Sequence, residues 1–288
     1  MRNFFVVTNQ SKDQNLVTTK RIREYLENKG CKCTMHNFVR CVKGEKGGYL
    51  NESDMPAGTE CVIVLGGDGT LIQTARDIAG SNIALIGVNL GRLGYLAEAE
   101  IDHIEQTLDR LISDDYEIQE RMMLSGTAHI GGKDLPTEVA LNDIAITRSG
   151  SLRLIAFHVY VNGMLLKTYG ADGIIVSTPT GSTGYNLSAG GPIVEPGARV
   201  LLLTPINAHT LNARSIILSP EDDIRIEIGE GRRGNIEIAE AVFDGAVTVE
   251  MKSGDSLNIR KAEETTRIIK MSKENFLEVL RRKFADAE

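Results

Sequence analysis

The stretch from residue 61 to residue 79, CVIVLGGDGTLIQTARDIA, limits the possible folds of this chain more than any other part. Its first five residues are apolar and rich in β-branched side chains, which is typical of a strand buried on both faces of a parallel sheet. After the glycines, apolar side chains recur at helical spacing, at Leu71, Ile72, Ala75, Ile78 and Ala79. A strand, a glycine-rich turn and a helix therefore follow one another, which predicts a βα unit of an open α/β sheet.

The turn itself, GGDGT, combines glycines with a single acid. Bare backbone N–H groups at the end of such a strand can approach phosphate oxygens closely, so Gly66, Gly67, Gly69 and Thr70 are predicted to bind phosphate. The turn lacks the lysine of a GxxxxGK[ST] loop and the third glycine of a dinucleotide fingerprint. The alternative is an ordinary βα turn in which Asp68 tolerates unusual backbone angles.

The composition of the 288-residue chain excludes several classes of protein. Its 42% hydrophobic and 25% charged residues are usual for a soluble globular enzyme. A net charge of -7 argues against a general nucleic-acid binder, because no basic surplus is available to neutralise phosphates. No apolar run approaches the roughly 18 residues of a membrane span, and the apolar part of MRNFFVVTNQ is too short for a signal peptide. We therefore expect a cytoplasmic protein that binds neither membranes nor nucleic acid.

The cysteines stand at positions 31, 33, 41 and 61. They form no CxxC pair, and no histidine cluster joins them at zinc spacing. Free thiols of a cytosolic protein are therefore expected, and no metal site built from protein ligands is predicted.

The first part of the chain alternates strands with helices. Strands are predicted at residues 4–7, 31–38, 61–65 and 83–89, and helices at 18–29, from 71 onward and at 101–112. Residues 42–59 contain KGEKGG and a proline without periodicity, which indicates a loop that either orders over a bound nucleotide or stays solvated. The alternation predicts a doubly wound parallel sheet.

From residue 125 on, the pattern changes to short alternating strands separated by turn signals, at 157–161, 174–178, 224–228, 247–251 and 267–271. Residues 273–284 then form an amphipathic helix, which Ser272 would cap and whose Phe276, Leu277 and Leu280 need a surface to bury them. We expect an α/β N-terminal domain of residues 1–121 plus 272–288, to which the last helix returns. A β-rich C-terminal domain is expected at residues 122–271.

Three further motifs carry polar groups suited to binding a ligand. Asn142-Asp143 offers a donor and acceptors to sugar hydroxyls or an adenine edge, although the same pair is common in turns. Asp172-Gly173 leads into a predicted strand. The stretch TPTGSTGYNLSAGGPIV at 178–194 combines glycines and hydroxyls with Tyr185 as an aromatic face for stacking. The alternative for this stretch is a glycine-rich surface loop.

In order and spacing, over nearly the whole chain, these motifs resemble those of the bacterial and archaeal NAD kinase family. The matching stretches are GGDGT at 66–70, NLGRLGYL at 89–96, Asn142-Asp143, Asp172-Gly173 and TPTGSTGYNLSAGGPI at 178–193. GGDGT alone is shared with lipid kinases and phosphofructokinases, whereas the long TPTGST stretch is much more specific. The resemblance implies that the β-rich domain binds NAD.

The resemblance also implies a role for each matching residue. Asp68 matches the catalytic acid near the 2′-hydroxyl of the adenosine ribose of NAD, and Asp172 matches an acid near the nicotinamide end. The residues implied in NAD binding are Asp68, Gly69, Asn142, Asp143, Arg153, Asp172, Thr183, Gly184, Tyr185, Asn186, Leu187, Ser188 and Ala246. Two of them depart from the family pattern, because Gly184 stands where alanine is usual and Ala246 where glutamine is frequent.

The implied activity is Mg²⁺-dependent transfer of the γ-phosphoryl group of ATP to the 2′-hydroxyl of the adenosine ribose of NAD, giving NADP. Inorganic polyphosphate stays open as a second donor. The resemblance further implies a homodimer or homotetramer with pockets completed across subunits. The alternatives are a diacylglycerol-type lipid kinase that shares GGDGT and a non-catalytic dinucleotide sensor.

Overall fold

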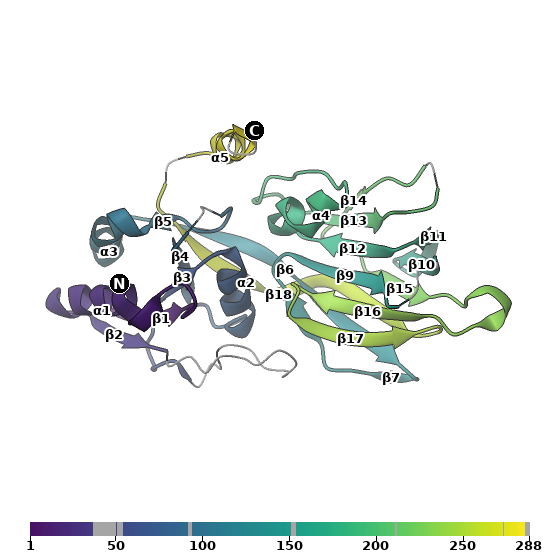
Figure 1. Cartoon of the computed structure of the whole chain (residues 1–288), viewed down its shortest axis with the longest axis horizontal. Helices are drawn as coiled ribbons and strands as arrows, with labels where there is room; N and C mark the ends of the chain where they lie inside the picture. The colour runs from purple at the N-terminus through teal and green to yellow at the C-terminus, as the bar shows by residue number, and fades with distance from the viewer. Residues whose placement is uncertain are drawn as a thin grey trace. The chain divides into compact units, whose positions relative to one another are not determined.

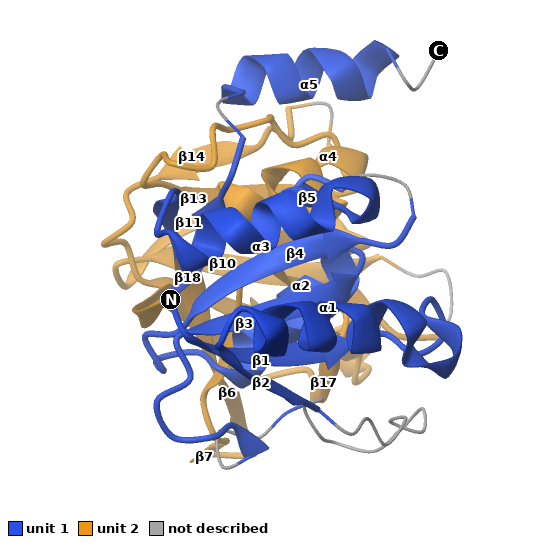
Figure 2. Cartoon of the chain, turned by 90° about the vertical axis from the view of Figure 1, so that its left-hand side faces the viewer, with its two compact units in different colours: residues 1–121, 266–288 blue, residues 122–265 orange. Residues whose placement is uncertain are grey.

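The computed structural model describes residues 1–36, 50, 54–91, 94–150, 154–210, 212–272 and 274–285. The chain divides into two compact units: unit 1 is Met1–Arg121 with Thr266–Glu288, and unit 2 is Met122–Thr265 (Figure 2). The end of the long strand β18 (Ser256–Lys270) therefore belongs to unit 1, whereas the residue pattern predicts that the second domain extends to residue 271. The difference arises because strand periodicity continues unchanged where β18 passes from one unit into the other.

Unit 1 contains the parallel sheet expected from the βα pattern. The strand order is β2 (Lys32–Met35), β1 (Asn3–Thr8), β3 (Cys61–Gly66) and β4 (Ala84–Asn89), and both β5 (Ala99–Glu100) and the end of β18 pair with β4 in parallel. Every residue of β3 and β4 is buried, which explains why their sequences are almost wholly apolar.

Helices cover both faces of this sheet, so it is doubly wound (Figures 1 and 2). α1 (Val17–Asn28) and α3 (Ile104–Ile112) share one core with β3, in which Ile22, Leu26 and Ile63 have no exposed surface. α2 (Asp68–Asp77) lies over the other face, where an added Cβ at Gly87 of β4 would meet Leu71 at 2.6 Å. The short helices η1 (Gln14–Leu16) and η3 (Ile101–His103) precede α1 and α3.

The carboxyl ends of the parallel strands meet at one edge, where α/β sheets bind their ligands. The backbone N–H of Asn9, after β1, donates to Leu65 O of β3 at 2.8 Å, and that of Leu90, after β4, donates to Gly66 O at 3.1 Å. The segments that follow β1, β3 and β4 are therefore neighbours.

Unit 2 is antiparallel throughout. One sheet has the order β14 (Ile216–Leu218), β13 (Leu201–Ile206), β12 (Gly173–Ser177), β9 (Asp143–Arg148), β16 (Ile238–Phe243) and β17 (Val247–Lys252). A second group has the order β11 (Met164–Ala171), β10 (Ile155–Val161), β15 (Ile224–Ile228) and β18, and β6 (Glu117–Ile130) pairs with β7 (Lys133–Asp134) and β8 (Glu138–Ala140). Alternate side chains of the two groups share one core, which includes Ile146, Val176 and Phe157.

The hairpin turns of unit 2 follow their local sequences. Asn162 and Gly163 between β10 and β11 both have positive φ, at 50° and 78°, and so do Asp244 and Gly245 between β16 and β17, at 49° and 72°. Two successive positive φ values define the type I′ turn that fits the twist of paired strands. Asn-Gly and Asp-Gly are the pairs that adopt it most readily.

The last helix differs from its prediction in two ways. α5 (Phe276–Ala285) begins after Asn275, whose Oδ1 accepts from Glu278 N while Glu278 Oε2 accepts from Asn275 N, so a capping box replaces the expected cap at Ser272. α5 belongs to unit 1, but none of its residues is buried, and Leu277 is 70% exposed. The expected burial of its apolar stripe is therefore only partial, since Phe276 and Leu280 are half-buried. None of the described helices has the length and apolarity needed to cross a membrane.

Candidate functional site

The carboxylate of Asp68 is held in place by backbone donors of unit 1. α2 begins at Asp68, earlier than the sequence predicts, because the extended backbone of Gly67 (φ -125°, ψ -176°) ends the strand and starts the helix. Asp68 Oδ2 accepts from Tyr95 N at 2.7 Å, and Oδ1 accepts from Leu96 N at 3.3 Å. A carboxylate has about four acceptor sites, so Asp68 keeps acceptor capacity for a further proton or donor.

Glycines make this arrangement possible. A Cβ on Gly94 would overlap the Asp68 carboxylate, so only glycine allows the segment after β4 to approach so closely. A Cβ on Gly69 would meet nothing within 4 Å, which leaves the backbone of the turn accessible. The positive end of the α2 dipole also favours an anionic group here. This turn is therefore suited to hold an acid and phosphate groups together.

In unit 2, Asp244 organises the Asn142-Asp143 pair. Its carboxylate accepts from three successive backbone N–H groups, those of Leu141 at 2.7 Å, Asn142 at 2.9 Å and Asp143 at 3.0 Å. The residue patterns described above do not single out Asp244, so this role was missed. The Asp-Gly hairpin turn was the available signal, but it says nothing about a partner about 100 residues away.

The pair itself has an incomplete set of partners. Asn142 Oδ1 is buried with no hydrogen-bond partner among the described residues. Burial, and then the negative charge of Asp244, raise the pKa of Asp143 to about 7. An unpaired buried acceptor is costly, and native proteins usually satisfy such a group with water or a ligand. The pair therefore has the character of a ligand site.

The glycine-rich stretch is a folded support and not a surface loop. It contains η4 (Thr180–Thr183) and α4 (Tyr185–Ser188). Thr178 N donates to Asn142 O at 2.8 Å, and a Cβ on Gly181 would overlap that same carbonyl. The stretch thus packs directly against the backbone of Asn142.

The side chain of Asn186 is an internal support of this stretch. It has no exposed surface, and its Nδ2 donates to the backbone oxygens of Ser182 and Pro192. Its Oδ1 accepts from Thr204 Oγ1 at 2.7 Å. All its hydrogen-bonding groups are used inside the protein, so this side chain shapes the stretch and has none left for a ligand.

A cavity of about 450 Å³ opens beside the pair. Its lining residues are Asn142, Asp143, Ala145, Thr147, Tyr185, Val242, Asp244 and Gly245. Tyr185 is 44% exposed and adds an aromatic surface to aliphatic walls and a few polar groups. That combination suits a flat heteroaromatic group with hydrogen-bonding edges.

Asp172 does not line this cavity. Gly173 is paired with Thr147, and Ser177 with Asp143, so Asp172 and Asp143 lie at opposite ends of the β9–β12 pair, about 15 Å apart at strand spacing. Asp172 accepts from Arg148 Nε at 2.7 Å and from Asn207 Nδ2 at 3.0 Å, and these hydrogen bonds lower its pKa.

The other predicted residues have varied positions. Gly184 lies near the pair, since a Cβ there would be 3.6 Å from Asn142 Nδ2. Thr183 is half-buried, and Leu187, Ser188 and Ala246 are exposed. Arg153 and most of the 42–59 stretch lie outside the described residues.

Among the residues that the structure describes, no group of three or more His, Cys, Asp or Glu side chains could hold a metal ion. The described cysteines, Cys31, Cys33 and Cys61, are free. Burial raises the pKa of the Cys33 thiol to about 12, so it is protonated at neutral pH.

Two family models match most of the chain. The ATP-NAD kinase N-terminal domain matches residues 4–116, and the ATP-NAD kinase C-terminal domain matches residues 141–271. The NAD kinase of Lachnospira eligens is 44% identical over 292 residues, covering 98% of this chain and 100% of the relative. The NAD kinase of Agathobacter rectalis is 45% identical over 286 residues, covering 99% of each chain.

Solved structures share the fold. An NAD kinase from Archaeoglobus fulgidus in complex with ATP aligns with a TM-score of 0.76 at 26% identity, covering 99% of this chain and 98% of the other. Yeast NADH kinase complexed with NADH aligns with a TM-score of 0.87 at 21% identity, covering 99% of this chain and 88% of the other. At 21% identity, the similarity to yeast NADH kinase shows a shared fold.

Proposed function

The chain belongs to the NAD kinase family, and from this premise we propose that it transfers the γ-phosphoryl group of ATP to the 2′-hydroxyl of the adenosine ribose of NAD⁺. The observation that carries the proposal is the Asp68 carboxylate, held by Tyr95 N and Leu96 N inside the GGDGT turn. Such a fixed acid can orient an attacking hydroxyl and accept its proton.

The proposed reaction needs alignment and charge neutralisation more than covalent chemistry by the protein. The 2′-oxygen forms a bond to the γ-phosphorus, the bond from that phosphorus to the bridging oxygen breaks, and ADP leaves. The hydroxyl proton passes to Asp68. Gly66, Gly67, Gly69 and Thr70 would surround the donor phosphates. The Thr70 N–H already donates to Gly67 O at 3.0 Å, so the other N–H groups of the turn would donate to the phosphates.

The dinucleotide side of the proposal rests on unit 2. The cavity beside Tyr185 would take the adenine, and a donor on the ligand would satisfy the buried Asn142 Oδ1. Asp143, Thr183, Gly184 and Ser188 would complete the surroundings of the adenosine. Asp172 would lie towards the nicotinamide, because it stands at the far end of the β9–β12 pair.

Mg²⁺ would bind to this chain together with the phosphates of the donor nucleotide. Mg²⁺ usually binds one or two carboxylates together with substrate phosphates and water, and Asp68 is the carboxylate of the turn. In that position the ion would supply positive charge that offsets the charge of the phosphates.

We further propose that the protein is cytoplasmic and forms a homodimer or homotetramer. Sedimentation velocity tests the oligomeric state directly.

One assay tests the activity. Purified protein is incubated with ATP, Mg²⁺ and NAD⁺, and NADP⁺ is read with an NADP-specific dehydrogenase. Parallel reactions replace ATP by polyphosphate, and NAD⁺ by diacylglycerol. Production of NADP⁺ supports the proposal; folded protein that binds NAD⁺ without producing NADP⁺ would instead support the dinucleotide sensor.

A further inference from the structure

The loop between β1 and α1 supplies the lysine that the GGDGT turn lacks in its own sequence. Lys12 Nζ lies 2.9 Å from the point where a side-chain Cβ would stand on Gly67. The ammonium group therefore occupies the space left open by a glycine of the turn. We propose that Lys12 binds the terminal phosphates of the phosphoryl donor at this turn, an inference that rests on the proposed kinase function.

The backbone on one side of Lys12 is tied to the turn. Asn9 N donates to Leu65 O at 2.8 Å, and Asn9 Nδ2 donates to Thr70 Oγ1 at 3.3 Å. Lys12 N in turn donates to Asn9 O at 2.9 Å. The loop and the glycine turn therefore form one hydrogen-bonded arrangement, which carries Lys12 with it.

The backbone on the other side is tied to α1. The Asp13 carboxylate accepts from Thr18 N at 3.0 Å, from Thr19 N at 2.9 Å and from Thr19 Oγ1 at 2.6 Å. Asp13 is therefore buried and occupied, and it does not neutralise its neighbour. Among the described residues no carboxylate forms an ion pair with Lys12, whose side chain is exposed. Its positive charge is available to a ligand.

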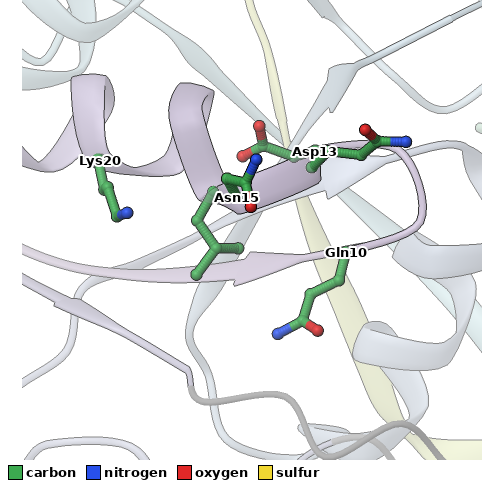
Figure 3. Close-up of a pocket in the computed structure, with 6 residues that line it drawn as sticks. Gln10, Asp13, Asn15 and Lys20 are labelled. Carbon is green, nitrogen blue, oxygen red and sulfur yellow. The ribbon is translucent and has the colours of Figure 1, made fainter.

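The Lys12 side chain also has a defined direction, towards the glycine turn. A cavity of about 570 Å³ lies beside this loop and is lined by Gln10, Asp13, Gln14, Asn15, Leu16 and Lys20 (Figure 3). Residues on both sides of Lys12 in sequence line that cavity, but Lys12 itself does not. Its ammonium group lies instead at Gly67, at the carboxyl edge of the sheet. The geometry therefore points to the glycine turn and not to the larger cavity.

Charge explains why the turn needs this residue. The backbone N–H groups of the turn donate hydrogen bonds but carry no net charge, and Asp68 adds a negative charge next to an anionic donor. An ammonium group at this position offsets part of this negative charge and makes a charge-assisted hydrogen bond to a phosphate oxygen. Because Gly67 has no side chain, the phosphates can approach the backbone and the ammonium group together.

Binding measurements test Lys12 without relying on activity. Lys12→Ala, Lys12→Arg and the control Lys32→Ala are titrated with ATP, AMP and inorganic triphosphate by calorimetry. Lys32 is exposed at the amino end of β2, the opposite edge of the sheet from the turn. We expect Lys12→Ala to weaken ATP and triphosphate binding about 10–100-fold, the loss of one charge-assisted hydrogen bond, and to weaken AMP binding far less. Lys12→Arg should restore part of the affinity, and Lys32→Ala should match the wild type.

Steady-state kinetics provide the second test. In Lys12→Ala the KM for ATP should rise by a similar factor while the KM for NAD⁺ and the melting temperature stay unchanged. Lys12→Gln serves if Lys12→Ala is unstable. ATP affinity within about twofold of wild type in a folded variant, well short of a lost charge-assisted hydrogen bond, refutes the role of Lys12. Wild-type protein that binds ATP but produces no NADP⁺ refutes the kinase function alone. The ATP affinities of the wild type and Lys12→Ala then still decide whether Lys12 binds the phosphates.

Discussion

The carboxylate of Asp68 accepts a hydrogen bond of 2.7 Å from the backbone N–H of Tyr95, 27 residues further along the chain. This bond joins the turn after β3 to the segment after β4, two of the motifs that the family resemblance rests on. It gives Asp68 a fixed position at the start of α2, which an isolated turn would not provide.

Replacing Asp68 with asparagine tests its catalytic role. Loss of the base should lower kcat by about 10²–10⁴-fold, while the dissociation constant for NAD⁺ changes far less, because unit 2 supplies the proposed ground-state contacts. The amide NH₂ would face a backbone N–H, so we also expect a loss of about 1 kcal/mol in the free energy of unfolding, read as a small fall in melting temperature. A folded variant within roughly fivefold of wild-type kcat would contradict the general-base expectation.

Gly94 and Gly91 form a matched pair in the same segment. A Cβ at Gly94 would overlap the Asp68 carboxylate, whereas a Cβ at Gly91 would meet nothing within 4 Å. We expect Gly94→Ala to displace the acid and lower kcat at least about tenfold, the lower part of the range for general-base catalysis. Gly91→Ala should behave as the wild type. Equal activity of the two variants would show that the position of Asp68 is unimportant.

Gly181 and Gly184 form a second pair, this time for stability and NAD⁺ affinity. A Cβ on Gly181 would overlap the Asn142 carbonyl, which is backbone and cannot rotate away. Gly181→Ala should therefore cost about 1–3 kcal/mol of unfolding free energy and weaken NAD⁺ binding. On Gly184 the nearest atom would be Gly181 O at 3.3 Å, a tight contact that needs only a small shift, so Gly184→Ala should lower the melting temperature much less than Gly181→Ala. Calorimetric melting of both variants measures these effects. A Gly181→Ala variant that is more stable than the wild type would contradict the predicted overlap at Gly181.

Asp244→Asn tests whether Asp244 positions the Asn142-Asp143 pair. Asparagine tolerates the positive φ of 49° but presents a single acceptor oxygen to three N–H groups. We expect NAD⁺ binding to weaken about tenfold, roughly the loss of one charge-assisted hydrogen bond, with ATP affinity unchanged. Titration of each nucleotide separately measures both, and parallel loss of both affinities would indicate general unfolding instead.

The raised pKa of Asp143 predicts a pH dependence of stability. Burial, followed by the charge of Asp244, raises the pKa from 3.8 to about 7, so the folded protein binds more protons than the unfolded chain between these values. The stability that protonated Asp143 contributes is fully present below the unfolded pKa and is lost as the pH rises through 7. The melting temperature of the wild type should therefore fall more between about pH 5 and about pH 8 than that of Asp143→Asn. An identical fall in both proteins would show that Asp143 does not titrate in this range.

Local sequence determined those features that depend on neighbouring residues. The apolar run of β3, the helix α1 and the strand β10 all appear where the sequence predicts them, because burial periodicity acts over a few residues. The order of motifs also identified the family, since both halves of the chain match its models.

Tertiary structure decided the features that join distant parts of the chain. Asp244 binds the backbone of Asn142 across 102 residues, and Lys12 reaches a glycine turn that begins more than 50 residues later. Asn186, which looks like a ligand-binding residue in its motif, is buried as a support of the stretch around it. Residue patterns report which faces of a segment avoid water, but they do not report which hydrogen-bonding groups meet after folding. Those partners follow from strand order and register, which are set by packing of the whole unit.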